Sequence, residues 1–459
     1  MRRAAAARRV SRRVGARPLL KGVHLPEVDE FQTSSGLKVL FAERGPLPLV
    51  ALQLWLPAGS AADPKRKDGL ADFTASLLRR GTRKRTADEL NEAVEFCGAS
   101  LACGAEEDFL SVRINAPSEH LRPMLEILAE VVRWPSFPRK EVESTRTRLL
   151  AQLANDLDDP GVVAERALLR ALWDDHPYGH DVVGTTKQVR TFTRQDAVAF
   201  QRSRFGPRVG LLVIAGQGEA RDVKAVAERV FGDWEGGPDR ALATPPLQPP
   251  VLSGRTLLVD KPEQTQSQIR IGGRGIPRGS EDIFAASLMN TALGGSFTSR
   301  LVEAIRVKRG LSYGVSSGFE RLMAAGSFAV STFTKTETTR AAIDLCLLEL
   351  AKMRRKGPSA EELDVAKRYL TGLFPLRFET NEAVAGALAE IRLYGLGDDW
   401  VERYRERLLQ VTVEEARRVA RKYILAEPPA IVVVGNAAQV KKQLSGLGPV
   451  SVREVSQLQ

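Results

Sequence analysis

The sequence predicts an α+β protein of two related domains, each a mostly antiparallel sheet with helices packed on one face. Three observations lead to this prediction. Short strand patterns alternate with amphipathic helical patterns, a proline-rich segment divides the chain, and strand and cap motifs recur at one offset. The 459 residues are 43% hydrophobic and 27% charged, a composition that can bury sizeable cores.

In the first half, two strands are expected around the Gly-Pro turn of residues 36–60, and a helix follows over residues 69–82. Thr86 and Glu89 form a capping box for the next helix. Two antiparallel strands are expected within residues 100–116. The remaining expected elements are helices from Ser118, from Pro138 to Asp156, over 162–173 and from Thr193 to Phe205, then a strand over 210–216 and a helix ending near Trp234.

A proline-rich, uncharged segment, residues 241–252, is expected to act as a semi-rigid linker between the domains. The second half then repeats motifs of the first after 218 or 219 residues: Gly36 matches Gly254, Thr193 matches Thr412, and Gly216 matches Gly435. This indicates an internal duplication, with chance coincidence of common patterns as the alternative. The predicted organisation is a disordered basic extension (1–28), a first domain (29–240), the linker (241–252), a second domain (253–445) and a tail (446–459).

The net charge of +11 is concentrated at the N-terminus, where residues 1–26 hold seven Arg, one Lys and no acid. The rest of the chain is only mildly basic, so no nucleic-acid binding is inferred. No apolar run is long enough to span a membrane, and no apolar h-region follows the arginines. Three cysteines fit a reducing compartment. We expect a bacterial cytoplasmic protein, with the mitochondrial matrix or the periplasm as alternatives.

The sequence offers no complete catalytic set of its own. His176 and His180 have helical metal-pair spacing, but Pro177 and Gly179 lie between them and favour a loop with two surface histidines. The Gly216-Gln217-Gly218 turn lacks the third glycine of a dinucleotide motif. No nucleophile elbow is present, and no cysteine lies beside a histidine partner.

Two stretches are informative together: GLADFTASLLRRGT at residues 69–82 and GGSFTSRLVEAIRVKRGLSYGVSSGF at residues 294–319. Over about residues 30–440 the chain resembles the pitrilysin/insulinase family of zinc peptidases, which includes processing peptidases. The first stretch matches the family's GLAHFLEHMLFKGT in frame, and the second matches GGGFSSRLFxxLRExxGLAY closely. The stretch that begins at His176 also resembles a family segment.

The resemblance implies that the zinc chemistry has been lost from the first stretch. Asp72 and Ser76 stand where the family has its two His ligands, and Ala75 stands where it has the general-base Glu. The third ligand, a Glu about eighty residues later, falls on Gln152. A lone carboxylate with neutral oxygens is a poor zinc site, and nothing there activates water.

The resemblance also implies that the second stretch keeps its function. The family's Arg and Tyr fall on Arg306 and Tyr313, which bind substrate and polarise the scissile carbonyl across a cleft from the zinc. We therefore expect a non-catalytic substrate-binding subunit of a heterodimeric zinc endopeptidase. Its partner would be a paralogue with an intact His-x-x-Glu-His motif that holds the zinc, and this chain would hold none.

Three alternatives remain open at this point. The chain could be a structural core subunit like those related to processing peptidases in respiratory complexes. It could be a peptide-holding protein without a peptidase partner, or a self-sufficient metallopeptidase with another ligand set.

Overall fold

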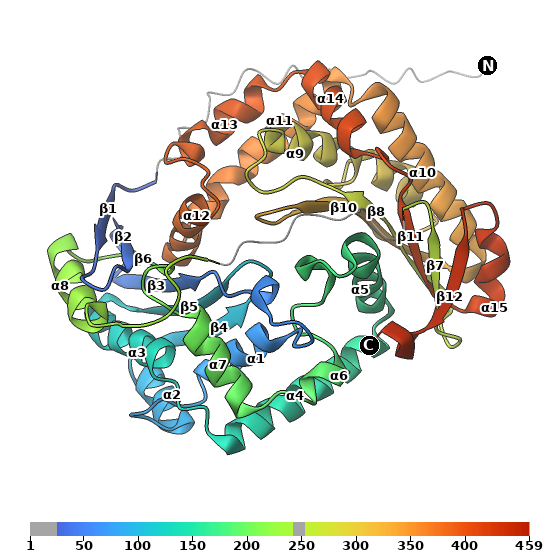
Figure 1. The fold of residues 1–459 in the computed structure, drawn as a ribbon. Coiled ribbons are helices and arrows are strands. Elements are labelled where there is room, and N and C mark those ends of the chain that lie inside the picture. Colours follow the sequence, from blue (N-terminus) through green and yellow to red (C-terminus); the bar gives the residue numbers. More distant parts are fainter. Residues whose placement is uncertain (1–24, 242–252, 459) are drawn as a thin grey trace, which may run out of the picture.

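The computed structural model describes residues 25–241 and 253–458, which form two six-stranded sheets with helices around them (Figure 1). The predicted α+β class with mostly antiparallel sheets is confirmed. Most of the basic extension and nearly all of the proposed linker lie outside the described residues. No described helix combines the length and the apolar character needed to cross a membrane.

The first sheet belongs to the N-terminal half and has the order β1-β2-β6-β3-β5-β4. Its only parallel pair is β2 with β6. Strand β6 also pairs with β3, so it lies between β2 and β3, the two strands that flank the Gly45-Pro46 turn. The strands are β1 Val28–Gln32, β2 Lys38–Glu43, β6 Leu211–Gly216, β3 Leu49–Leu56, β5 Leu110–Pro117 and β4 Ser100–Ala105.

The second sheet repeats this arrangement as β12-β7-β11-β8-β10-β9. Strand β11 begins and ends 219 residues after β6, and each pairs in parallel with the first long strand of its half. Residues expected as a tail contribute β12, which pairs in parallel with β7. The strands are β12 Val450–Glu454, β7 Thr256–Asp260, β11 Ala430–Gly435, β8 Gln266–Arg274, β10 Gly326–Lys335 and β9 Val315–Arg321.

The helices of each half follow the local signals closely. Three predicted threonine caps, at Thr86, Thr193 and Thr412, are capping boxes in the structure. The α-helices are α1 Leu70–Leu78, α2 Ala87–Phe96, α3 Leu121–Arg133, α4 Arg139–Asp158, α5 Pro160–Trp173, α6 Thr186–Val189, α7 Arg194–Arg204, α8 Ala220–Phe231, α9 Ile283–Leu293, α10 Thr339–Lys356, α11 Ala360–Leu373, α12 Asn381–Leu393, α13 Trp400–Gln410, α14 Val413–Tyr423 and α15 Ala437–Val440.

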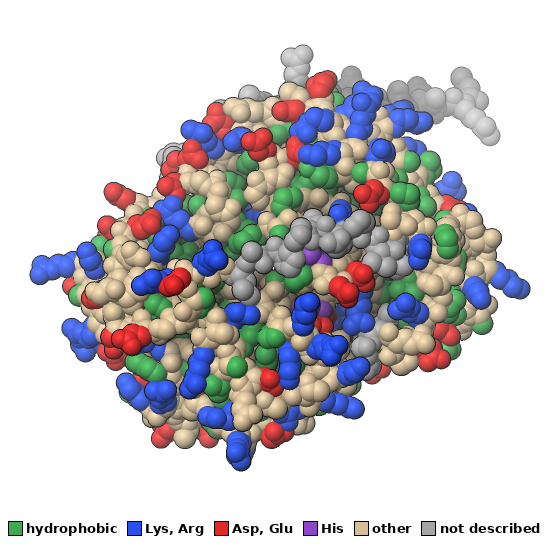
Figure 2. Space-filling view, viewed as in Figure 1, with side chains coloured by type: hydrophobic (Ala, Val, Ile, Leu, Met, Phe, Trp, Pro, Cys, Tyr) green, Lys and Arg blue, Asp and Glu red, His purple; other side chains and the backbone are tan. Residues whose placement is uncertain are grey.

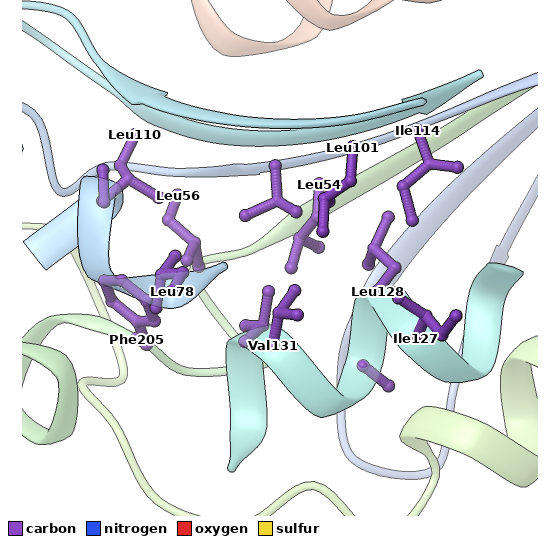
Figure 3. Packing of buried hydrophobic residues seen from close by; sticks show 14 of the residues in the cluster. Leu54, Leu56, Leu78, Leu101, Leu110, Ile114, Ile127, Leu128, Val131 and Phe205 are labelled. Carbon is purple, nitrogen blue, oxygen red and sulfur yellow. The ribbon is translucent and has the colours of Figure 1, made fainter. Parts of the chain in front are cut away.

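The main core of the first half lies between one face of its sheet and helices that include α1 and α3 (Figure 3). Leu54 and Leu56 of β3 point from the sheet toward Leu128 and Val131 of α3, and Leu78 of α1 lies at one end of the cluster. All five side chains are fully buried. This is the layer that holds the helix with the degenerate motif in place.

The opposite faces of the two sheets are covered by exchanged helices. Helix α5 of the first half packs on β8 and β11 of the second sheet, and α12 of the second half packs on β3 and β6 of the first. Each exchange has its own apolar cluster: Leu168 and Leu172 lie against Val432, while Leu388 lies in a cluster with Leu40. The two halves therefore share cores rather than only a linker.

Candidate functional site

Helix α1 begins at a glycine that the surrounding backbone requires. Gly69 has a φ of 96°, and a Cβ there would lie 2.6 Å from the carbonyl oxygen of Val183. The carboxylate of Asp63 accepts hydrogen bonds from the amides of Gly69 and Ala71, each 2.7 Å long. A buried acid thus caps the helix from the preceding loop, and burial raises the pKa of Asp63 well above its usual value.

The predicted apolar face of α1 is buried as expected: Leu70, Phe73, Leu77 and Leu78 all lie in the first core. The three degenerate motif positions lie between these apolar residues on the same helix. Asp72 and Ser76 are half-buried one turn apart, and Ala75 is fully buried.

Asp72 lies in an environment that disfavours its charge. Its pKa is raised to about 6, mainly by burial; the charge of Arg148 on α4 lowers it and that of Asp181 raises it. The positive charge that acts on the carboxylate of the motif therefore comes from a guanidinium, which would also repel a divalent cation bound at Asp72.

Gln152, the predicted counterpart of the distal ligand, lies on α4 one turn after Arg148, and its side chain is exposed. The donor set of the four positions is one carboxylate, one hydroxyl, one amide and a methyl group, which does not fit zinc. In residues 25–241 and 253–458, no group of three or more His, Cys, Asp or Glu is arranged to hold a metal ion. We derive no chemical step through zinc bound to this chain.

The second predicted pair, Arg306 and Tyr313, is brought together in the structure. The guanidinium carbon of Arg306 lies 4.3 Å from the ring centroid of Tyr313 and 4.7 Å from that of Phe297. Both rings are largely exposed, at 76% for Tyr313 and 70% for Phe297. Stacked rings hold a guanidinium by cation–π attraction while its N–H edge stays available. Phe297 is a site residue that the sequence reasoning did not single out.

The element that carries Arg306 is a π-helix, η4 (Val302–Lys308), where an ordinary helix was expected. Val302 and Ile305 anchor it in the second core, and Ile305 also accepts a hydrogen bond of 2.9 Å from the amide of Leu311. Such wide turns often occur at functional sites. Before η4, a Cβ on Gly294 would lie 2.4 Å from the hydroxyl of Ser317, so this turn requires glycine.

Both candidate regions lie beside an edge strand of their own sheet. Helix α1 packs against β4, and η4 packs against β9; these two strands end equivalent edges of the two sheets. The unpaired backbone of an edge strand can bind an extended peptide. The recorded ring partners of Arg306 both come from its own half, so the structure does not join the Arg306 pair to α1.

The structure confirms that the two neighbouring histidines lie in a loop, but the expectation that both lie on the surface is wrong, because His176 is buried. His176 and His180 flank a short turn, Pro177–Gly179, and the Nδ1 atom of His176 accepts a hydrogen bond from the amide of Tyr178. The His176 ring packs against the rings of Trp173 and Tyr178. The Gly216 turn is likewise explained by packing, because a Cβ there would lie 2.2 Å from the Leu49 carbonyl oxygen.

Comparisons with known proteins agree with this fold and its two halves. A family model described as insulinase (peptidase family M16) matches residues 38–186, and one described as the peptidase M16 inactive domain matches residues 191–370. An uncharacterized zinc protease of Streptomyces coelicolor is 25% identical over 424 residues, covering 91% of this chain and 92% of the relative. One of Mycobacterium tuberculosis is 26% identical over 401 residues, covering 87% and 91%.

Solved structures give the same result. A peptidase M16 inactive domain from Pseudomonas fluorescens has a TM-score of 0.84 at 29% identity and covers 89% of this chain and 98% of that one. A protease from Helicobacter pylori has a TM-score of 0.84 at 19% identity, with 90% and 100% coverage, which shows the fold alone. The chain belongs to the M16 (insulinase) peptidase family, with both characteristic domains present.

Proposed function

We propose that this chain is the non-catalytic, substrate-binding subunit of a heterodimeric zinc endopeptidase. A paralogous partner with an intact His-x-x-Glu-His motif would hold the zinc and the general base. The observation that carries the proposal is the contrast between the two motifs. Asp72, Ala75 and Ser76 provide no metal-binding set, whereas Arg306 and Tyr313 are stacked and accessible.

The arrangement of Arg306 suits it to receive a substrate. Within the described residues no hydrogen bond is recorded for its guanidinium, whose faces are flanked by Phe297 and Tyr313. The free N–H edge and the exposed Tyr313 hydroxyl can both donate to a peptide carbonyl on which negative charge develops. The adjacent edge strand β9 offers backbone groups that would align an extended peptide with this pair.

The test combines the purified chain with a paralogue that carries the intact motif. The chain alone should not cleave peptides, and the mixture should. In the mixture, Arg306→Ala should lower kcat/KM by about 100-fold, the usual effect of removing a donor to a developing oxyanion. Tyr313→Phe should also lower it, while Arg309→Ala, which removes an exposed charge at the end of the same element, should not.

Three results would contradict the proposal. An active mixture whose rate is unchanged by both substitutions would exclude a shared site and leave a structural or peptide-holding role. One tightly bound zinc per isolated chain, together with activity, would show a self-sufficient peptidase. A mixture that binds and cleaves no better than the partner alone would also refute the proposed subunit role.

A further inference from the structure

Arg306 lies beside aromatic rings, whereas other arginines of this chain lie beside acids. Figure 2 shows Lys, Arg, Asp and Glu side chains intermixed over the face of the molecule that it draws. In the second half, for example, Arg300 pairs with Glu362 at 2.6 Å. No ion pair is recorded for Arg306 within the described residues, and the one acid of η4, Glu303, pairs with Lys308 at 3.5 Å. The rings are therefore the recorded contacts that restrain the Arg306 guanidinium.

Packing in the core does not explain the aromatic residue at position 297. Phe297 is 70% exposed, and it does not belong to the apolar cluster that anchors η4. In residues 25–241 and 253–458 no stacking of its ring on another aromatic ring is recorded, whereas the guanidinium carbon of Arg306 lies 4.7 Å from its centroid. The contact with Arg306 is therefore the structural reason for an aromatic ring here.

The turn that carries Phe297 is fixed by Asn290, near the end of α9. The Nδ2 atom of Asn290 donates a hydrogen bond of 3.0 Å to the carbonyl oxygen of Ser317, and its Oδ1 atom accepts one of 2.7 Å from the Ser317 hydroxyl. The Ser317 amide in turn donates to the carbonyl oxygen of Gly294 at 3.1 Å. The Gly295 amide donates to the carbonyl oxygen of Asn290 at 2.8 Å. The backbone before Phe297 is thus tied both to α9 and to the edge strand β9.

The second ring, that of Tyr313, also projects from a restrained segment. The carbonyl oxygen of Gly314 accepts hydrogen bonds from the hydroxyls of Ser312 at 2.8 Å and of Thr332 on β10 at 2.9 Å. The two rings therefore come from backbone that is held on either side of η4. Rings on fixed backbone can order the long, flexible arginine side chain that lies beside them.

We infer that Phe297 is a positioning residue, whose ring acts with that of Tyr313 to hold the Arg306 guanidinium in place for the substrate. An aromatic face attracts a guanidinium without accepting its N–H hydrogen bonds, which a carboxylate would occupy. The effect of Phe297 on catalysis rests on the proposed function, because there Arg306 acts on the substrate of a partner's zinc site. The arrangement of the three side chains belongs to this chain alone, so it can be tested without a partner.

The first test is nuclear magnetic resonance of the isolated full chain with isotopically labelled arginine. Ring currents displace the signals of protons that lie over an aromatic face, so the Hδ signals of Arg306 should lie upfield of those of exposed arginines. Arg306→Lys assigns them by their loss. Phe297→Leu should move them part of the way back, and Phe297→Trp should keep them displaced. Phe96→Leu is the matched control, because Phe96 is 88% exposed and no cation is recorded over its ring among the described residues.

The second test measures peptide cleavage by the mixture of this chain with the paralogue. Phe297→Leu should lower kcat by about two- to fivefold, the fold-change that corresponds to an exposed cation–π contact, and should leave KM nearly unchanged. Phe297→Trp should retain the rate of the unchanged chain. Adding Phe297→Leu to Arg306→Ala should cause no further loss, because a positioning residue acts only through the group that it holds.

Each test has a result that would overturn the inference. In the spectrum, this is an Arg306 signal in the ordinary range, or one that a folded Phe297→Leu variant does not move. In the kinetics, it is a further loss of rate when Phe297→Leu is added to Arg306→Ala, which would show that Phe297 acts independently of Arg306. An inactive mixture would instead refute the proposed function, and the spectrum of the isolated chain would still decide whether Phe297 holds Arg306.

Discussion

Besides the shared apolar clusters, one carboxylate of the first half makes hydrogen bonds to the second half, and Asp108→Ala tests how much it contributes. Asp108 lies in the turn between β4 and β5 of the first half. Its carboxylate accepts hydrogen bonds from the Tyr178 hydroxyl, from the Met323 amide at 2.8 Å and from the Tyr394 hydroxyl at 3.3 Å. Met323 and Tyr394 belong to the second half, so a single side chain ties the two halves together. Burial and the adjacent carboxylate also raise the pKa of Tyr394.

The size of the effect follows from these contacts. Each hydrogen bond to a charged group contributes about 1.5–3 kcal/mol, but bonds to one shared acceptor are not additive. The Tyr178 hydroxyl keeps its contact with the Ala324 amide at 3.3 Å. We therefore expect Asp108→Ala to lower the free energy of unfolding by about 2–4 kcal/mol. Asp108→Asn keeps one acceptor oxygen and should cost about half as much.

The assay is urea unfolding followed by circular dichroism, with the free energy extrapolated to water. Asp364→Ala is the control, because Asp364 forms only an exposed pair with Arg368 on α11 and should change stability by less than about 0.5 kcal/mol. If Asp108→Ala is no more destabilising than this control, the carboxylate does not hold the halves together.

Two further predictions concern buried groups near the candidate sites. Burial and the neighbouring Glu320 raise the pKa of Glu107 to about 7. Between about pH 4.5 and 7 the folded protein therefore binds more protons than the unfolded chain. The free energy of unfolding should fall as the pH rises through this window. Glu107→Gln should flatten that part of the stability–pH curve, and an unchanged curve would contradict the assignment. Gly69→Ala should lower the free energy of unfolding by about 2–4 kcal/mol through its left-handed φ and its clash with Val183, whereas Gly104→Ala, with open space around it, should be neutral or stabilising.

The features that the sequence predicted well are those set by neighbours three or four residues apart. The apolar face of α1 and the capping boxes at Thr86, Thr193 and Thr412 depend only on such local spacing. The repeat was visible because β6 and β11 keep the same pattern at one offset. The pairing of Arg306 with Tyr313 came from the family resemblance, since a spacing of seven residues does not by itself bring two side chains together.

The features that were missed depend on contacts between distant parts of the chain. The sequence of α5 (Pro160–Trp173) does not show whether this helix packs on the sheet of its own half or on the other sheet. Its apolar face could be buried against either one. The insertion of β6 between β2 and β3 also depends on which strands pair, and the local sequence of a strand does not determine its pairing partners. Asp108 has no sequence signal, as its three donors lie 70 to 286 residues away.

The poor fit of α1 to a zinc site extends beyond the four proposed ligand and base positions. The residues that fix the helix, Gly69 and the apolar face buried in the first core, are not the ones that would bind a metal, so the motif could change while the fold persisted. The residues around these positions do not suit a zinc site either. Ala75 is fully buried, so a glutamate there would need a polar partner or would remain protonated. Arg148 acts on Asp72 from α4, and Gln152 is exposed. Restoring His, Glu and His at positions 72, 75 and 76 would therefore still leave the positive charge of Arg148 acting on position 72 and no carboxylate at position 152. Under the proposed subunit role, the zinc and the general base come from the partner, so positions 72, 75 and 76 of this chain need not supply them.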